Sequence, residues 1–290
     1  MIFTKLLTRR RLSFIIIYIF AVDEVYMGFF DGVLICSDWD GTLFDGSEVP
    51  KKNIEAIEYF INSGGHFTIA SGRQPAYIKD LTKKVNVNTY VIALNGAVIT
   101  DLNSGEILRE GFIDDEAYKI LDTMVDGGFD FDTIAVIEQG AKMFTWYTTD
   151  EYNQHKAEIK KKNIHDIVMR ANNEAAAIKM TEFANRFIST VPNCKYTVHR
   201  SFDIGVEILR SDLTKGAAAR CVAEKIGAKL LIGVGDFEND IPLIKEADIG
   251  YAVDNATDAL KKLADRITVS VTEGAIASII TELEKKKLSQ

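Results

Sequence analysis

The stretch VLICSDWDGTL at residues 33–43 decides the fold. It opens with a continuous apolar run, Val33 to Cys36, which predicts a strand buried on both faces within a parallel sheet. Side chains two positions apart on an extended chain point the same way, so Asp38 and Asp40 are expected to share one side. Trp39 is then expected to turn toward packing.

The two aspartates carry the first chemical signal. Carboxylates held this close repel each other, so either one is protonated or a cation sits between them. Both arrangements suit catalysis by a nucleophile beside a general acid. Gly41 permits a tight turn and would let its N–H approach an anion, with Thr42 next to it. The alternative is a strand that runs into an ordinary Asp-Gly turn.

Strands and helices alternate outside the middle of the chain. Further strands are expected at His66–Ala70, Tyr90–Leu94, Leu230–Val234, Ile249–Val253 and Ile267–Val271. Helices are expected behind Pro50, where Ile54, Ile57 and Ile61 recur at helical spacing, and at Ala217–Ile226 and Ile276–Lys285. This order predicts an α/β fold with a doubly wound, mostly parallel, Rossmann-like sheet.

The middle of the chain has a different pattern of expected strands and helices, which predicts a small inserted α+β domain. Its expected elements are two helices, at 116–125 and 173–190, and four strands, at Thr133–Ile137, Met143–Tyr147, His165–Arg170 and Tyr196–Arg200. We therefore expect a core formed by residues 27–112 and 201–290 and an insert at 113–200. The run Lys160-Lys161-Lys162 is interpreted as a solvated helix face.

Other polar motifs follow the predicted strands. Ser71-Gly72-Arg73 combines a hydroxyl with a cation, both suited to a phosphate, and Asn95-Gly96-Ala97 ends the next strand. Each alone is also compatible with a plain turn. Gly235-Asp236-Phe-Glu-Asn239-Asp240 offers oxygen ligands for a hard cation such as Mg²⁺, or the caps of an ordinary helix start.

Lys215 is placed against local preference. It begins a predicted helix and is followed by Gly216, although helix starts favour acids over cations. Conflicts of this kind are typical of functional sites, but a solvated surface lysine is the alternative. Ligands of open parallel sheets bind at the carboxyl ends of the strands. One pocket there would collect Mg²⁺-binding acids, a lysine, a hydroxyl and an arginine, which together make a phosphate site.

Composition excludes several other classes. The chain has 290 residues, with 34 Lys and Arg against 42 Asp and Glu, for a net charge of −8. An acidic chain lacks the broad basic surface that binds nucleic acid or anionic lipid. Three scattered cysteines and four histidines form neither a disulfide framework nor a zinc motif. The P-loop, dinucleotide and G-x-S-x-G motifs are not matched.

The first 26 residues differ from the rest. Basic residues precede an apolar run, Leu12 to Val22, which is too short for a helix to cross a bilayer, since that needs about 20 residues. The layout resembles a secretory signal without a clear cleavage site. The alternatives are a misassigned start, with Met27 as the true one, or a structured extension. No stable membrane span is expected.

At these motifs the sequence resembles the haloacid dehalogenase-like phosphatase superfamily, and within it the Cof-type, type IIB branch. The resemblance covers Met27 to the carboxyl terminus, and Asn255-Ala256 also looks like a turn of that branch. It implies a Rossmann-like core with a C2-type cap inserted between the second and third motifs. It also implies a cytoplasmic location, although a true signal at 1–26 would mean export or membrane association. Trp39 departs from the aliphatic residue usual there.

The resemblance implies a Mg²⁺-dependent phosphomonoester hydrolase. Asp38 would attack phosphorus and become an aspartyl phosphate, and Asp40 would protonate the leaving oxygen and later activate water. The implied phosphate-binding residues are Gly41, Thr42, Ser71, Gly72, Arg73, Asn95 and Lys215. The implied metal ligands are Asp38, Asp40 through its carbonyl, and Asp236, supported by Asn239 and Asp240.

The expected substrate is a small phosphorylated metabolite, either a sugar phosphate or a phosphorylated cofactor. A phosphomutase of the same superfamily and a non-catalytic binding protein on the same fold remain as alternatives. Substrate choice would belong to the cap, where the candidate lining residues are Glu138, Phe144, Trp146, Tyr147 and His155. Packing inside the cap is the alternative for these five. Nothing in the sequence indicates a particular oligomeric state.

Overall fold

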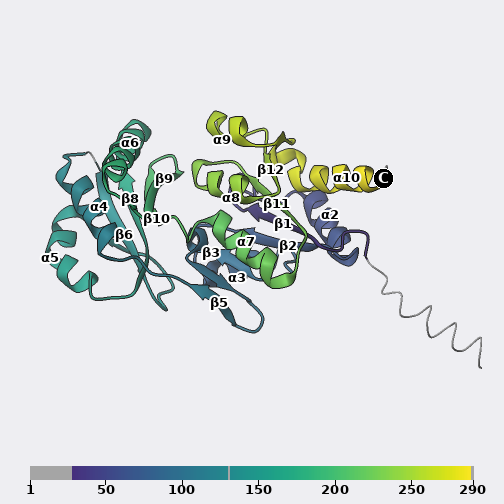
Figure 1. Ribbon diagram of the computed structural model, residues 1–290, viewed down its shortest axis with the longest axis horizontal. Helices are drawn as coiled ribbons and strands as arrows, with labels where there is room; N and C mark the ends of the chain where they lie inside the picture. The colour runs from purple at the N-terminus through teal and green to yellow at the C-terminus, as the bar shows by residue number, and fades with distance from the viewer. Residues whose placement is uncertain (1–27, 130, 289–290) are drawn as a thin grey trace, which may run out of the picture.

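The computed structural model describes residues 28–129 and 131–288. The leader expected at 1–26 lies outside the described residues. Two bodies lie side by side, each built on its own sheet (Figure 1). We call the body with the larger sheet the core and the other the cap.

The core carries an eight-stranded sheet in the order β13-β12-β11-β1-β2-β3-β4-β5. Neighbouring strands from β13 to β3 are parallel, and β4 and β5 add an antiparallel extension. The bounds are β1 Val33–Asp38, β2 His66–Ala70, β3 Val91–Ala93, β4 Val98–Thr100, β5 Ile107–Glu110, β11 Leu230–Gly235, β12 Ile249–Ala252 and β13 Arg266–Ile267. The expected α/β fold with a mostly parallel sheet is confirmed.

The helices of the core cover both faces of this sheet. They are α2 Lys51–Asn62, α3 Pro75–Leu81, α7 Lys215–Ile226, α8 Ile241–Glu246, α9 Asp258–Leu263 and α10 Ala275–Leu288. On β1, Ile35 packs into the cluster that holds α2 and α10, whereas Leu34 and Cys36 pack into the cluster that holds α7. Successive residues of a strand face opposite sides, so both sides of β1 are buried and its run is continuously apolar.

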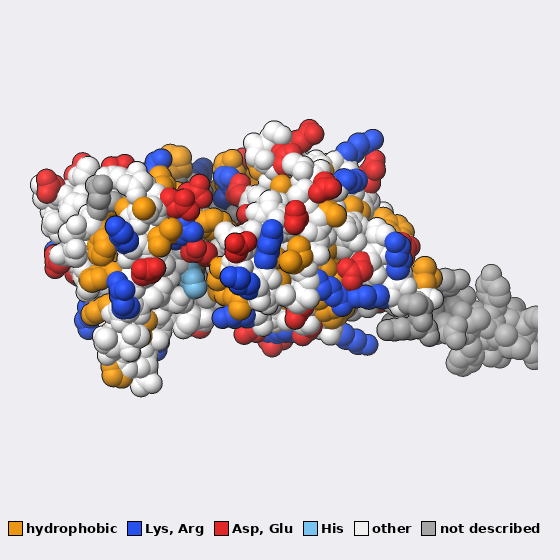
Figure 2. Space-filling view, turned by 90° about the horizontal axis from the view of Figure 1, so that it is seen from above, with side chains coloured by type: hydrophobic (Ala, Val, Ile, Leu, Met, Phe, Trp, Pro, Cys, Tyr) orange, Lys and Arg blue, Asp and Glu red, His pale blue; other side chains and the backbone are white. Residues whose placement is uncertain are grey.

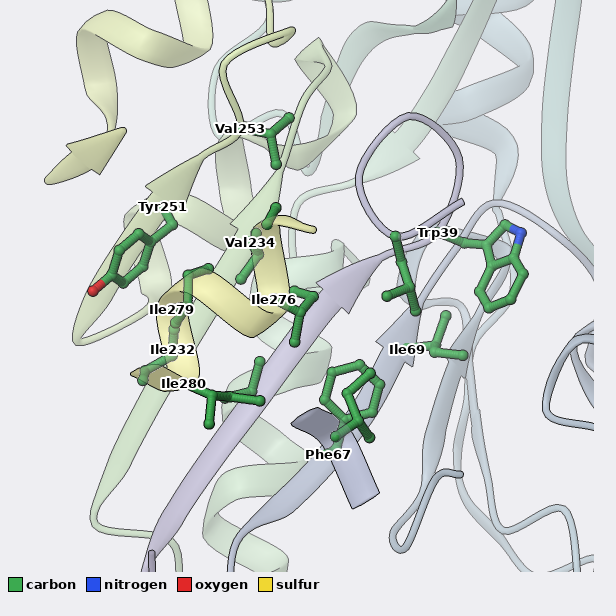
Figure 3. Close-up of a cluster of buried hydrophobic side chains, with 14 of the residues drawn as sticks. Trp39, Phe67, Ile69, Ile232, Val234, Tyr251, Val253, Ile276, Ile279 and Ile280 are labelled. Atoms are coloured by element: carbon green, nitrogen blue, oxygen red, sulfur yellow. The ribbon is translucent and has the colours of Figure 1, made fainter. Parts of the chain in front are cut away.

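Trp39 belongs to the first of these clusters, as expected. Its side chain is fully buried and stacks on Phe44 with ring centroids 5.7 Å apart. Figure 3 shows Trp39 among the labelled side chains of this cluster, with Ile69 from β2 and Ile276 from α10. The aspartates on either side of Trp39 are thereby directed away from the packed interior.

The cap carries a five-stranded antiparallel sheet in the order β7-β6-β8-β10-β9. The bounds are β6 Phe131–Glu138, β7 Thr145–Tyr147, β8 Ile164–Ala171, β9 Tyr196–Phe202 and β10 Gly205–Arg210. The helices α4 Asp115–Asp126, α5 Thr149–Ile159 and α6 Glu174–Thr190 pack on one face through a shared apolar cluster. The other face is turned toward the core (Figure 1).

The structure differs from expectation both in the cap and in the core. Its sheet runs on to Arg210, past the boundary expected at 200, because β10 pairs with both β8 and β9. The helix α5 was not expected, and it ends at Ile159, so the lysine run at 160–162 follows the helix instead of lying on its face. In the core, the strand expected at Ile267–Val271 is cut to Arg266–Ile267, and Val271 begins a short 3₁₀ turn.

The molecular surface carries charges of both signs. On the face drawn in Figure 2, basic and acidic side chains are interspersed and do not gather by sign. Among the described residues, no helix combines the length and apolarity that crossing a membrane requires. The expected cytoplasmic location stays a prediction.

Candidate active site

The expected site residues gather where the core faces the cap. A cleft of about 590 Å³ lies between the two bodies. From the core it is lined by Asp38, Asp40, Ser71, Gly72, Arg73, Asn95, Phe237 and Asn239. From the cap it is lined by Phe144, Trp146, Val168, Arg170, Ser201, Phe202 and Glu207. Asp236 lines an adjoining hollow together with Asp40.

A buried lysine lies behind the first aspartate. Lys215 begins α7, and its Nζ donates to Oδ1 of Asp38 and to Oδ1 of Asp240, each at 2.6 Å. Only 1% of Lys215 is exposed. Burial lowers the pKa of Lys215, but the two carboxylates outweigh this effect and raise it. The lysine therefore stays charged and holds Asp38 in place.

Three carboxylates form a cluster that fits a hard divalent cation. Oxygens of Asp38, Asp236 and Asp240 lie within 4.8 Å of one another. Burial and the charge of Asp240 raise the pKa of Asp236 to about 7, and the same two causes raise the pKa of Asp38. Burial contributes most to both shifts, and the attraction of Lys215 does not cancel the combined effect of burial and the repulsion from Asp240. An all-oxygen donor set with excess negative charge suits Mg²⁺.

Asp240 serves mainly to hold the loop together. Its Oδ2 accepts the backbone N–H groups of Asp236 and Phe237, at 3.0 and 3.1 Å, while its Oδ1 accepts from Lys215. Asp240 is completely buried. Its oxygens are thus occupied by protein donors, which leaves Asp38 and Asp236 as the side chains with capacity for a cation.

The loop after β1 supports Asp236 from the other side. The Thr42 hydroxyl donates to Oδ1 of Asp236 at 2.7 Å. Gly41 has a φ of +81°, and a Cβ there would lie 2.4 Å from Oδ2 of Asp236, so only glycine fits. The N–H of Gly41 donates to the Phe44 carbonyl, which corrects the expectation that it faces an anion. Asn255 donates to the Gly41 carbonyl at 2.8 Å.

Asp40 and Arg73 form an ion pair in the cleft. Nε and Nη2 of Arg73 donate to the two carboxylate oxygens of Asp40, each at 2.8 Å. The guanidinium also lies over the ring of Tyr77, 4.4 Å from its centroid. The Ser71 hydroxyl accepts the N–H of Arg73 at 3.2 Å. Arg73 therefore orients Asp40 in this structure, a contact that its expected phosphate-binding role did not include.

Asn95 joins the core to the cap. Its Nδ2 lies 2.7 Å from both carboxylate oxygens of Glu207 on β10, and its Oδ1 accepts from Nδ2 of Asn239 at 3.2 Å. Asn95 is in the left-handed region, with a φ of 50°. Gly96 follows, and a Cβ there would lie 2.4 Å from backbone oxygens of Leu213 and Thr214. This turn thus aims the Asn95 amide at the cap.

The five cap candidates divide between the cleft and the cap. Phe144 and Trp146 line the cleft. Tyr147 joins the cap's apolar cluster and lies against the ring of His155, with centroids 6.1 Å apart. Glu138 forms an ion pair with Lys162 at 3.0 Å. Tyr147, His155 and Glu138 therefore make their contacts within the cap and not in the cleft.

Four polar residues at the boundary between the two bodies were not expected from the sequence. Glu207 and Asp166 of the cap are buried, and Arg200 of β9 bonds Glu238 of the core at 2.7 Å. One feature of the sequence could have pointed to Glu207: it is an ionisable residue between two apolar residues of a strand, Val206 and Ile208. Such residues stay inside a fold only when paired or functional.

Comparisons with known proteins agree with this architecture. A family model described as haloacid dehalogenase-like hydrolase matches residues 35–280. A curated relative, the 5-amino-6-(5-phospho-D-ribitylamino)uracil phosphatase of Bacillus subtilis, is 27% identical over 251 residues, which cover 85% of this chain and 94% of the relative.

Solved structures share the fold. A haloacid dehalogenase-like hydrolase from B. subtilis superposes with a TM-score of 0.69 at 21% identity, covering 86% of this chain and 99% of that one. A subclass IIB sugar phosphatase superposes with a TM-score of 0.68 at 20% identity, covering 86% and 98%. The family model spans most of the chain and includes every motif described above. The resemblance seen in the sequence is confirmed, and the chain belongs to the haloacid dehalogenase-like hydrolases.

Proposed function

We propose that this protein hydrolyses phosphate monoesters of small metabolites through a covalent intermediate on Asp38. The observation that carries the proposal is the contact between Asp38 and Lys215, at 2.6 Å, at the floor of the cleft. A fixed carboxylate beside a buried cation suits attack on a phosphoryl group, whose negative charge the lysine would balance. Several curated relatives have names that contain the word phosphatase, and these names support the assignment.

The first step is attack by a carboxylate oxygen of Asp38 on phosphorus. A new bond forms between that oxygen and phosphorus, and the bond to the ester oxygen breaks. Asp40, which lines the same cleft, is assigned as the general acid that gives a proton to the leaving oxygen. Ser71, Lys215 and Asn95 are assigned to hold the phosphoryl oxygens, whereas Arg73 is assigned to orient Asp40.

The second step returns Asp38 to its starting state. The Asp40 carboxylate takes a proton from water, and the water oxygen attacks phosphorus. The bond between phosphorus and Asp38 breaks, which releases inorganic phosphate and leaves Asp40 protonated for the next cycle. The same carboxyl thus serves as acid and then as base.

Asp38, the Asp40 carbonyl and Asp236 are the groups assigned to a Mg²⁺ ion, with Asn239 and Asp240 in support. When bound, such an ion would offset negative charge on the transferring phosphoryl group. The acidic cluster supports this assignment, since its charge exceeds what Lys215 balances.

The test is release of inorganic phosphate from a panel of small phosphate esters. The panel includes sugar phosphates, phosphorylated cofactors and 5-amino-6-(5-phospho-D-ribitylamino)uracil, the compound named for the B. subtilis relative. Each ester is assayed with Mg²⁺ and with EDTA, using wild type, Asp38→Asn and Asp126→Asn. Asp126 is an exposed residue of the cap and serves as the matched control.

The proposal predicts Mg²⁺-dependent release that persists in Asp126→Asn and falls about a thousandfold or more in Asp38→Asn. Conversion of a sugar phosphate to its isomer without phosphate release would point to a phosphomutase. Binding of esters without turnover would point to a non-catalytic protein. Either result would overturn the hydrolase assignment.

A further inference from the structure

Two carboxyl groups of the cap lie next to the cleft. Glu207 of β10 is paired with Val168 of β8, and Asp166 lies two residues from Val168 along the same strand. Residues two apart share a face, and those directly paired share it too, so Glu207, Val168 and Asp166 lie on one side of the sheet. Glu207 and Val168 line the cleft, so this side faces the substrate space.

Both carboxyl groups are almost completely withdrawn from water. Asp166 is 1% exposed, and neither of its carboxylate oxygens meets a hydrogen-bond donor among the described residues. Glu207 is 2% exposed, and the donor that the described structure gives it is Nδ2 of Asn95. Burial and the neighbouring Glu207 carboxyl raise the pKa of Asp166 well above its ordinary value. The Asp166 carboxyl therefore keeps its proton to a higher pH than an exposed aspartate does.

This pair is costly to keep for structure alone. A buried acceptor without a donor destabilises the fold, and an apolar pair of similar size would avoid that cost. Groups of this sort persist where they meet a ligand. The ligand must supply hydrogen-bond donors, because the acceptors of Glu207 and Asp166 outnumber the donors around them.

Aromatic side chains of the cap narrow the chemistry of that ligand. Trp146 pairs with Ala135, and Ala135 pairs with Val168, so Trp146 lies on the same face of the cap sheet as Glu207. Phe144 and Trp146 line the cleft from β7 and the residues before it, and 48% of Trp146 is exposed. An aromatic face packs against C–H groups, while a nearby carboxylate accepts O–H groups. A carbon chain that carries several hydroxyls satisfies both the aromatic part and the carboxylate part of this face.

We propose that Glu207 is a specificity-determining residue, which accepts hydrogen bonds from hydroxyls of a sugar or polyol leaving group. Asp166, which lies beside Glu207 on the same face of the sheet, is a positioning residue that keeps that carboxyl turned toward the cleft. Asn95 links this recognition to the phosphoryl end, because its amide bonds Glu207 while its carbonyl accepts from Asn239. The inference rests on the proposed phosphatase activity and names the leaving group that the same cleft selects.

The test compares two esters of equal chain length, glucitol 6-phosphate and hexyl phosphate. The second lacks the hydroxyls, so the ratio of the two kcat/KM values measures recognition of hydroxyl groups. A site built to bond hydroxyls discriminates strongly against an analogue without them. We expect wild type to prefer glucitol 6-phosphate by about a hundredfold or more.

The ratio is then measured in Glu207→Leu and in the isosteric Glu207→Gln, which protects the test against misfolding of the first. We expect it to fall at least tenfold in Glu207→Leu and by less in Glu207→Gln, which keeps one acceptor. Asp166→Leu, which cannot donate to Glu207, should raise KM for glucitol 6-phosphate and leave kcat nearly unchanged, a split that general loss of structure would not produce. Glu182→Gln, an exposed change on α6, is the control.

Three results would overturn the inference. One is a wild-type ratio near one. Another is a ratio of kcat/KM values that stays unchanged in both Glu207 variants, while wild type still hydrolyses both esters. That result would contradict the inference about Glu207 but not the proposed phosphatase activity. The third is an absence of hydrolysis of these and all other panel esters by wild type, which removes the proposed function as well.

Discussion

Arg73 donates two parallel hydrogen bonds to the carboxylate of Asp40, from Nε to Oδ2 and from Nη2 to Oδ1, each 2.8 Å long. Half of the Asp40 side chain is exposed, so packing alone does not fix its direction. The planar guanidinium supplies that direction, because two parallel bonds define the orientation of a carboxylate where one bond would not. The ring of Tyr77 in turn supports the guanidinium.

Arg73→Lys should lower kcat because a lysine cannot make the paired bonds to Asp40. A hydrogen bond to a charged group contributes about 1.5–3 kcal/mol, which corresponds to roughly a ten- to hundredfold loss of kcat. Steady-state kinetics on the best panel ester measure this loss. Tyr77→Phe keeps the ring beneath the guanidinium and should stay close to wild type.

Inhibition by inorganic phosphate separates two roles of Arg73. If its main role is to orient Asp40, the inhibition constant for phosphate should change little in Arg73→Lys. A large loss of phosphate affinity with an unchanged kcat would instead assign Arg73 to the phosphoryl group and contradict this prediction.

Removal of Mg²⁺ should lower the unfolding temperature at pH 8. A ligand that binds only the folded state at a hundred times its Kd stabilises it by about 2.7 kcal/mol, a shift of several degrees. Asp236→Asn should lose most of that shift. In EDTA the same variant should unfold at a higher temperature than wild type, because above pH 7 the raised pKa of Asp236 makes its ionised form unfavourable in the folded state.

Thermal denaturation with Mg²⁺ and with EDTA, at matched ionic strength, measures both effects. Asp126→Asn should behave like wild type under both conditions. An equal Mg²⁺ shift in Asp236→Asn and wild type would show that the ion acts elsewhere.

The strand ends could be predicted from the sequence for a simple physical reason. Val33–Cys36 and Leu230–Val234 are buried on two faces, so both appear as unbroken apolar runs, and polar residues mark where burial stops. Asp38 and Asp236 each come one residue after these runs, separated from them by Ser37 and Gly235. Because the strands are parallel neighbours, their carboxyl ends coincide.

Elements with a weak apolar pattern were harder to predict. The helix α5 has the sequence TDEYNQHKAEI, and only Tyr152 and Ile159 of it are buried. It therefore lacks the apolar stripe from which a helix is usually predicted. A signal was nevertheless present, because Thr148 and Glu151 form a capping box at its start. The strand β10 was missed although Glu207 is its single charged residue before Arg210.

Contacts between side chains that are far apart along the chain could not be predicted from the sequence. Arg73 and Asp40 are 33 positions apart, and Asn95 and Glu207 are 112 apart, so no local pattern relates them. The link from Asn95 to Glu207 also depends on where the cap sits on the core. Residue types near strand ends predicted the phosphoryl end of the cleft, whereas its opposite wall required the three-dimensional structure.

Lys215→Met should destabilise the protein and abolish turnover. Lys215 is the cation that bonds Asp38 and Asp240, and its removal leaves two buried carboxylates unbalanced. Breaking a buried ion pair in this way costs about 3–5 kcal/mol. Chemical denaturation in EDTA measures the loss. Lys161→Met removes an exposed lysine and should have little effect.

A second change distinguishes lost charge balance from lost packing. Adding Asp240→Asn to Lys215→Met removes one of the stranded charges, so the double variant should be more stable than the sum of the single effects predicts. Strict additivity would mean that Lys215 stabilises the fold through its apolar stem, contrary to this account.

The buried pair in the cap predicts a dependence of stability on pH. The folded-state pKa of Asp166 is raised, whereas in the unfolded chain it lies near the ordinary value of about 3.9. Below that value both states hold the proton. As pH rises from there toward the raised folded value, the unfolded chain releases a proton that the folded protein keeps, so the free energy of unfolding decreases.

Asp166→Asn should remove this dependence and unfold at a higher temperature than wild type at pH 8. The asparagine amide carries no charge at any pH and can donate to Glu207. Denaturation curves from pH 5 to pH 8 in EDTA measure the difference between the two proteins, which cancels the slopes of the acids near Lys215. For one proton that difference grows by about 1.4 kcal/mol per pH unit at most. A difference that stays constant with pH would contradict the raised pKa of Asp166 in the folded protein.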